Sequence, residues 1–147
     1  MGLRITKHTD FALRALIFLA VRPDRRVTVQ EMADGHGISL AHLQKIVRAL
    51  AQGGWVELTR GVNGGAQLAL DPAEIVIGAV MRELDDLDGL LECFRPETDA
   101  CAVSPACRLK GALRGAQEAF YAHLDDLTLA DVVRGRAAGK LRELTGG

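Results

Sequence analysis

Apolar residues recur at helical spacing in the N-terminal third of the chain. One set, at positions i, i+3, i+4 and i+7, comprises Leu13, Leu16, Ile17 and Ala20. It predicts a helix that starts near residues 6–9 and ends before Pro23. A second set with the same spacing comprises Leu43, Ile46, Val47 and Leu50. Ser39 precedes this set as a helix cap and Gly53 follows it as a helix stop, so a further helix is predicted between them.

A short helix is predicted between these two, because Thr28 and Glu31 have the spacing of a capping box. Residues 35–38 (Gly-His-Gly-Ile) then form a tight turn, which makes a helix–turn–helix unit. The face opposite the second apolar stripe carries small, polar and basic residues: Ala41, Gln44, Lys45, Arg48 and Gln52. Such a face suits a helix that reads the DNA major groove, whereas the plain alternative is a helical hairpin with a solvated face.

Two segments that favour strands follow, Trp55–Arg60 and Ala66–Leu70, joined by the glycine-rich stretch Gly61–Gly65. This pattern predicts a β-hairpin. The stretch is not a phosphate-binding loop, because no Gly-Lys-Ser/Thr follows it and the next element is a strand. Three helices followed by a hairpin predict a winged helix, with Arg60 and Asn63 on the wing, where they meet phosphates or the minor groove.

The second half of the chain is predicted to be helical. Residues 71–74 (Asp-Pro-Ala-Glu) open a helix whose apolar face is Ile77, Val80, Met81 and Leu84. Residues 104–105 (Ser-Pro) restart a helix with Cys107 in its first turn. Its apolar stripe comprises Leu109, Leu113, Ala116, Phe120 and Leu124. An arm of about 20 residues, roughly 30 Å long, has little of its own chain to pack against, so we expect it to pair with its copy in a second subunit.

Thr128 caps a last short helix, and residues 134–147 are expected to be a flexible tail. The predicted fold class is therefore mainly α with a small β-hairpin. A winged helix-turn-helix domain is expected over residues 1–71, and a loop with dimerisation helices over residues 72–133. The apolar run 13–21 is too short for a membrane span and follows charged residues, so we expect a cytoplasmic protein with no signal peptide or anchor.

Charge is distributed unevenly along the chain. Up to residue 70 there are nine Lys and Arg against five Asp and Glu, and from residue 71 onward nine against fourteen. A basic N-terminal half and an acidic C-terminal half suit a protein that contacts a polyanion through its N-terminal half only. Both imbalances are also small enough to reflect solvated faces.

The three cysteines, Cys93, Cys101 and Cys107, all lie in one stretch. Thiols stay reduced in the cytoplasm, so such a group binds metal more often than it forms disulfides. Seven and five residues separate the cysteines, which is wide for a zinc knuckle and favours an iron–sulfur cluster. The alternative is a structural or thiol-reactive trio. A fourth ligand must come from elsewhere: Lys110 is a poor one, and more distant candidates are His8, Asp10 and His123.

Several segments, taken together, are specific enough to indicate a protein family. They are Leu3–Thr6 with Thr9–Leu16, Arg60–Gly65, Ile77–Leu84, Pro105–Lys110 and Leu127–Val133. On these segments the chain resembles the iron–sulfur winged-helix repressors, the superfamily of the IscR regulators. Within that superfamily it looks most like the nitric-oxide-sensing NsrR repressors. The resemblance implies a homodimer that binds double-stranded DNA at a palindromic operator. It also implies a [4Fe–4S] cluster, with [2Fe–2S] as the alternative.

The resemblance also implies which residues hold the cluster. Cys93, Cys101 and Cys107 would be ligands. IscR-type proteins place a histidine three residues after the last cysteine, where this chain has Lys110. NsrR-type proteins can instead use an aspartate, here Asp10, that the partner subunit donates, and His8 is its rival. The Cys93–Cys101 gap is longer than is usual in the family.

The expected function is a DNA-binding repressor that senses nitric oxide through its cluster and releases DNA on nitrosylation. The predicted DNA-binding residues are Ser39, Gln44, Lys45, Arg48, Arg60 and Asn63. One alternative is a regulator of the same fold that senses iron–sulfur status, redox state or cysteine metabolism. Another is an iron–sulfur electron carrier. No enzyme is expected, because no Ser/His/Asp or Cys/His constellation is legible.

Overall fold

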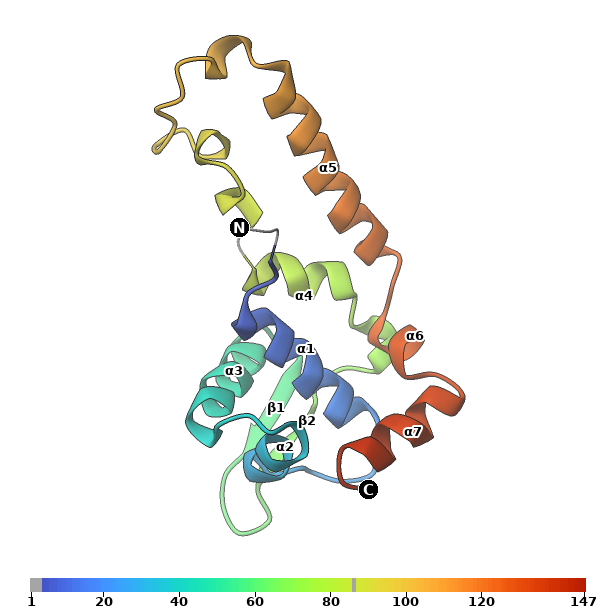
Figure 1. Cartoon of the computed structure of the whole chain (residues 1–147). Coiled ribbons are helices and arrows are strands. Elements are labelled where there is room, and N and C mark those ends of the chain that lie inside the picture. The colour runs from blue at the N-terminus through green and yellow to red at the C-terminus, as the bar shows by residue number, and fades with distance from the viewer. Residues whose placement is uncertain (1–3, 86) are drawn as a thin grey trace.

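A computed structural model describes residues 4–85 and 87–147 (Figure 1). Its α-helices are α1 (Lys7–Ala20), α2 (Val29–His36), α3 (Leu40–Gln52), α4 (Ile77–Leu84), α5 (Arg108–Asp125), α6 (Leu129–Val133) and α7 (Arg136–Leu144). The strands β1 (Val56–Thr59) and β2 (Gly65–Leu68) form an antiparallel hairpin. Four 3-10 turns complete the described elements: η1 (Pro72–Glu74), η2 (Leu87–Gly89), η3 (Glu92–Phe94) and η4 (Ser104–Ala106). The predicted fold class, mainly α with a small β-hairpin, is confirmed.

Local capping fixes where α1 and α2 begin. The side chain of Thr6 accepts a hydrogen bond from the amide of Thr9 at the start of α1. Thr28 and Glu31 form the predicted capping box of α2. That helix ends at Gly37, which has φ 64°, the left-handed conformation that glycine adopts without strain.

The core lies beneath α1, which packs against α3, α6 and β2. Its largest fully buried side chains include Leu16, Met32, Leu43, Ile46, Leu50, Ile75, Met81 and Leu129. The apolar stripe predicted for α3 is buried throughout, whereas in the stripe predicted for α1 Leu16 and Ala20 are buried and Leu13 and Ile17 are half-buried against the core. In the hairpin, the register runs from Val56 opposite Leu68 to Thr59 opposite Gly65. The wing loop projects from the end of the domain that lies away from the arm (Figure 1).

The prediction of one continuous helix from Asp71 through Leu84 is wrong. Asp71 caps only the single turn η1, and α4 starts separately at Ile77. The intervening residues are extended because they pair with the segment before α6: Ile77 N–H donates to Leu127 O at 2.9 Å, and Leu129 N–H donates to Ile75 O at 2.8 Å. Long-range backbone pairing and the burial of Ile75 thus override continuation of the local helix. Similarly, Cys107 is the N-cap of α5, after η4, and does not lie in its first turn.

The C-terminal segment also differs from the prediction. Where the sequence predicts a flexible tail over residues 134–147, the structure has α7, whose Ala138 and Leu141 pack against the core. Hydrogen bonds from Arg22 to the end of α7 hold it in place. Among the helices of the described residues, none could cross a membrane on length and apolarity.

An ion pair joins α4 to the base of the α5 arm. The Arg82 guanidinium binds both carboxylate oxygens of Asp125, one of them at 2.8 Å. It also lies over the Tyr121 ring, 4.7 Å from the ring centroid. Gly78 lies directly beneath Asp125, so that a Cβ at this position would collide with the carboxylate. These contacts fix the direction in which the arm leaves the domain (Figure 1).

The same pair makes stability depend on pH. The hydrogen bonds from Arg82 lower the pKa of Asp125. The contribution of Asp125 to stability is therefore fully present above its unfolded pKa of about 3.9, and is lost as the pH falls through the folded value. We expect Asp125→Asn to lower the free energy of unfolding at pH 7 and to leave it equal to wild type at the lowest pH, in urea titrations. Equal pH dependence in the two proteins would contradict this role.

Candidate metal centre and nucleic-acid interface

The three cysteines reach one place from three different pieces of chain. Cys93 lies in η3, Cys101 lies in the following loop, and Cys107 caps α5. All three are free thiols and half-buried. They line a single hollow of about 350 Å³ together with Leu91, Glu92, Val103, Leu109, Lys110 and Leu113. The structure thus brings the three predicted ligands together at the free end of the arm (Figure 1).

Two contacts hold the outer cysteines relative to α5. Phe94, next to Cys93, is buried under Arg114, whose guanidinium lies 4.2 Å from the ring centroid and donates to Phe94 O at 2.9 Å. Cys107 Sγ accepts a hydrogen bond from Lys110 N–H at 3.3 Å. The N-terminus of a helix presents partial positive charge, which suits a sulfur that carries the negative charge of a metal ligand.

A polar network, which sequence reasoning missed, ties the middle cysteine to the same helix. Lys110 Nζ donates to Asp99 Oδ2 at 3.2 Å and to Ser104 Oγ at 2.9 Å, and Ser104 in turn donates to Asp99. Asp99 Oδ1 accepts from Cys101 N–H at 3.2 Å. The hydrogen bonds from Ser104 and Lys110 lower the pKa of Asp99, so it stays an ionised acceptor. Lys110 is therefore held in place by Asp99 and Ser104.

Three thiols around one hollow are a donor set that an iron–sulfur cluster can use. Within the described part of the chain, no three His, Cys, Asp or Glu side chains are grouped closely enough to share one metal ion. Thiols spaced around a hollow can instead hold the separate corners of a larger object, as cluster ligands do. The hollow is walled mainly by apolar side chains, which suits a cofactor that water degrades.

The proposed fourth ligand lies elsewhere in this chain. Asp10 is in the first turn of α1, and its carboxylate accepts from Arg14 at 3.1 and 2.7 Å. Asp10, His8 and His123 are all absent from the lining of the hollow. In Figure 1, α1 lies within the domain, and the cysteine loop lies beside the end of α5 that is farther from α1. Within one chain, the structure does not bring Asp10 to the cysteines.

The predicted DNA-binding residues are all exposed, at the start of α3, along it and on the wing. Gln44, Lys45 and Arg48 are exposed on the side of α3 opposite its buried stripe. The hydroxyl of Ser39 accepts from His42 N–H at 3.3 Å and keeps its own hydrogen for donation. Arg60 and Asn63 are exposed on the wing.

The tip of the wing carries an exposed residue that the sequence did not single out. Val62 is fully exposed at its tip. The hairpin turn beside it uses Gly61 with φ 102° and Gly65 with φ 148°, both in the region that favours glycine. The wing therefore presents a valine between Arg60 and Asn63.

A family model for Rrf2, described as an iron-dependent transcriptional regulator, matches residues 5–135. The chain belongs to the Rrf2 family. Among curated Rrf2-type relatives, the HTH-type transcriptional regulator NsrR of Geobacillus kaustophilus is 44% identical over 137 residues, which cover 92% of this chain and 93% of that protein. The NsrR of Bacillus subtilis is 41% identical over 135 residues, with 91% and 92% covered. The resemblance to NsrR regulators is confirmed.

Solved structures of other regulators share this fold. The IscR of T. potens superposes with a TM-score of 0.70 at 25% identity, covering 90% of this chain and 88% of that one. The CymR of Staphylococcus aureus superposes with a TM-score of 0.68 at 22% identity, covering 88% and 98%. At that identity, the second likeness shows the fold alone. As a member of the Rrf2 family, the chain is a transcriptional regulator.

Proposed function

We propose that this protein is a homodimeric repressor that binds a palindromic operator while it carries an iron–sulfur cluster and leaves DNA when the cluster is nitrosylated. The observation that carries the proposal is that Cys93, Cys101 and Cys107 line one hollow at the end of the arm. The iron-dependent description of the family and the NsrR relatives support it. The favoured cluster is [4Fe–4S], with [2Fe–2S] as the alternative.

Residues from two subunits would hold the cofactor. The three thiols hold it to one chain, and Asp10 of a second copy supplies the remaining ligand, with His8 as its rival. When bound, the cofactor supplies iron atoms that react with nitric oxide, a small neutral radical that needs no charged pocket. A carboxylate oxygen is a hard ligand for a soft centre, so Asp10 would hold the cofactor less firmly than the three thiols. Asp10 must also leave Arg14, its partner at 2.7 Å, to take this role.

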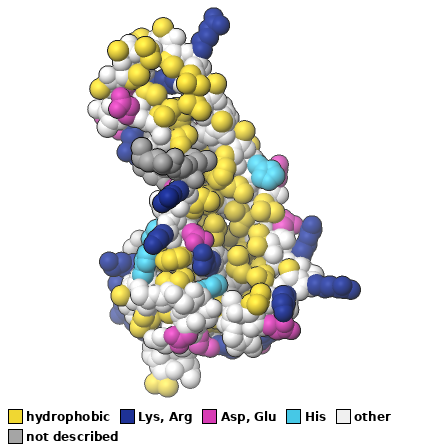
Figure 2. All heavy atoms as spheres, viewed as in Figure 1, with side chains coloured by type: hydrophobic (Ala, Val, Ile, Leu, Met, Phe, Trp, Pro, Cys, Tyr) yellow, Lys and Arg dark blue, Asp and Glu magenta, His cyan; other side chains and the backbone are white. Residues whose placement is uncertain are grey.

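The partly exposed apolar stripe of α5 supports the dimer. Leu109 is 63% exposed, and Leu113, Phe120 and Leu124 are half-buried in the single chain. Figure 2 shows hydrophobic side chains running along the arm toward the domain. An apolar stripe of this length is typical of a surface that a partner covers. We propose that a second copy covers it and brings its α1 near the cysteine hollow.

A short path links Asp10 to the DNA-reading helix. Phe11, the next residue, packs its ring edge-to-face against His42 of α3, with the centroids 5.1 Å apart. His42 lies two residues before Gln44. Anchoring Asp10 on the partner's arm would therefore set the position of α3. Dimeric readers need half-sites one helical turn apart, roughly 34 Å, so a small displacement costs much affinity.

On DNA, Gln44 and Lys45 would approach base edges, and Ser39, Arg48, Arg60 and Asn63 would contact the backbone. We expect Gln44→Ala to relax base preference at one operator position, at a cost of about 1–3 kcal/mol. Arg48→Ala should weaken binding to all sequences alike and lower the salt slope by about 1. Competition binding at several salt concentrations measures both effects. The reverse pattern would contradict the assignment.

The proposal is tested by nitric oxide titration of anaerobically purified protein on operator DNA, with visible and Mössbauer spectra recorded in parallel. We expect the cluster signal and the operator complex to disappear over the same range of nitric oxide. A complex that survives nitrosylation but responds to cluster loss or oxidation would favour the second candidate, a sensor of iron–sulfur status, redox state or cysteine metabolism. The structural likeness to T. potens IscR favours this candidate.

A further inference from the structure

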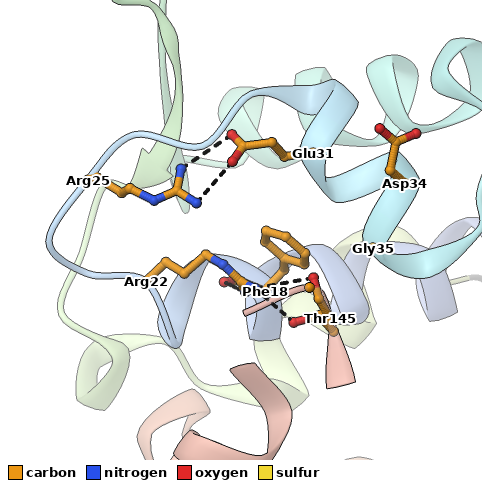
Figure 3. Close-up of a pocket in the computed structure, with 8 residues that line it drawn as sticks. Phe18, Arg22, Arg25, Glu31, Asp34, Gly35 and Thr145 are labelled. Atoms are coloured by element: carbon orange, nitrogen blue, oxygen red, sulfur yellow. Dashed lines mark hydrogen bonds and ion pairs between the residues drawn. The ribbon is translucent and has the colours of Figure 1, made fainter. Parts of the chain in front are cut away.

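Arg22, just beyond the end of α1, is only 2% exposed, although arginine is rarely buried. Its guanidinium donates to Phe18 O at 3.3 Å in the last turn of α1. It also donates to the end of α7: to Arg142 O at 3.4 Å, Thr145 O at 3.2 Å and Thr145 Oγ1 at 3.1 Å. The guanidinium stacks on the Phe18 ring, 3.7 Å from the centroid. Figure 3 shows Arg22 extending between Phe18 and Thr145.

One cation thus satisfies the carboxyl-terminal ends of two helices. Those ends present unpaired carbonyls and partial negative charge, which favour a guanidinium. Burial, with Arg25 and Arg142 nearby, lowers the pKa of Arg22. The acceptors on α7 offset that unfavourable burial, and three of the four described here belong to α7 or the residue after it. Without α7, the buried charge would lose most of its partners.

The end of α7 also packs directly on the helix–turn–helix unit. A Cβ added at Gly35 of α2 would lie 2.8 Å from Thr145 O and 2.6 Å from the Phe18 ring. Only glycine leaves room for this contact. The same residues line a hollow of about 290 Å³, whose other wall is the Arg25–Glu31 ion pair at 2.9 Å (Figure 3). Arg22, Gly35 and Thr145 therefore join α1, α2 and α7 at one point.

We propose that residues 136–147 form a C-terminal latch that holds α2 where it supports the DNA-reading helix α3, and that Arg22 is the positioning residue through which the latch acts. α2 needs such support because it has only eight residues, of which Met32 and Ala33 are buried. It packs against α3, so a loosened α2 would loosen the recognition helix. The latch shares no residue with the cysteine hollow and acts whether or not a cluster is bound.

The test uses two variants of the full chain that break the latch from opposite sides. Arg22→Met removes the donors and keeps an apolar stem against Phe18. Gly35→Ala pushes Thr145 away, although alanine itself favours the helix over glycine. We expect hydrogen exchange of the α2 amides to become about 10- to 100-fold faster in both, as for the loss of charged hydrogen bonds. Operator affinity should fall about tenfold, while the oligomeric mass and cluster absorbance stay unchanged.

The matched control is Gly139→Ala in α7, where an added Cβ meets nothing within 4 Å. It should leave α2 exchange and operator affinity unchanged. Unchanged exchange in Arg22→Met and Gly35→Ala would overturn the latch. So would acceleration shared equally by all core amides, because that reports general destabilisation. Wild-type protein that fails to bind its operator would count against the proposed function and not against the latch, since exchange is measured without DNA.

Discussion

Replacing Cys107 by serine is expected to abolish the visible absorbance of the cluster and to lower operator affinity about 1,000-fold, toward the non-specific value. The fold should survive, because Cys107 is the N-cap of α5 and serine is a strongly preferred cap. The variant therefore removes a ligand while keeping the helix start. Circular dichroism, iron content per chain and operator binding under anaerobic conditions measure the three outcomes.

Ala106→Ser is the matched control for this substitution. It adds the same hydroxyl one residue away, at an exposed position of η4 that does not line the hollow. Iron content and operator affinity should equal those of wild type. If Cys107→Ser retained the full cluster signal and wild-type affinity, then Cys107 would not be a ligand and the cysteine hollow would not be the sensor.

Replacing Asp10 by alanine should have the second largest effect. Three thiols remain, so a cluster should still form, but we expect it to be lost about 10- to 100-fold faster and its reaction with nitric oxide to change. Operator affinity should fall with it, because the link between one subunit's arm and the other's α1 is gone. The free energy of unfolding of the cluster-free protein should change by less than about 1 kcal/mol, because an exposed i,i+4 ion pair contributes little.

The variant Arg14→Ala distinguishes the role of Asp10 as a cluster ligand from its role in the ion pair with Arg14. It removes the same salt bridge, in which Arg14 and Asp10 approach to 2.7 Å, but leaves the carboxylate in place. If Asp10 acts as a ligand, this variant keeps a stable cluster. If Asp10→Ala and wild type had equal cluster lifetimes and equal nitric oxide responses, Asp10 would not be a ligand, and His8 would be the remaining candidate.

The fold was predictable wherever signals are local. Thr28 with Glu31 and Ser39 mark helix starts within four residues of the amides they cap, and the structure uses both caps. The glycine-rich turn of the wing is similarly local. Asp71 carries an equally good local signal, yet its helix stops after one turn because Ile75 pairs with Leu129, far along the chain. Such pairing leaves no trace in the residues next to Asp71.

In the candidate site, too, local features were predictable and long-range contacts were not. The clustering of three cysteines in one stretch sufficed to predict that they converge. The Asp99–Ser104–Lys110 network was not predictable, because a lysine and an aspartate eleven residues apart in a loop have no characteristic spacing. The docking of α7 depends on Arg22 and Thr145, which are 123 residues apart, so composition alone made the segment look like a flexible tail.

In the proposed function, a cofactor held by three sulfurs controls how two α3 helices meet DNA. The most direct measurement compares the operator affinity of one anaerobic preparation before and after removal of its iron, at fixed salt. We expect cluster-loaded protein to bind at least about 100-fold more tightly, because the half-sites must match one helical turn. Equal affinity with and without iron would contradict the account.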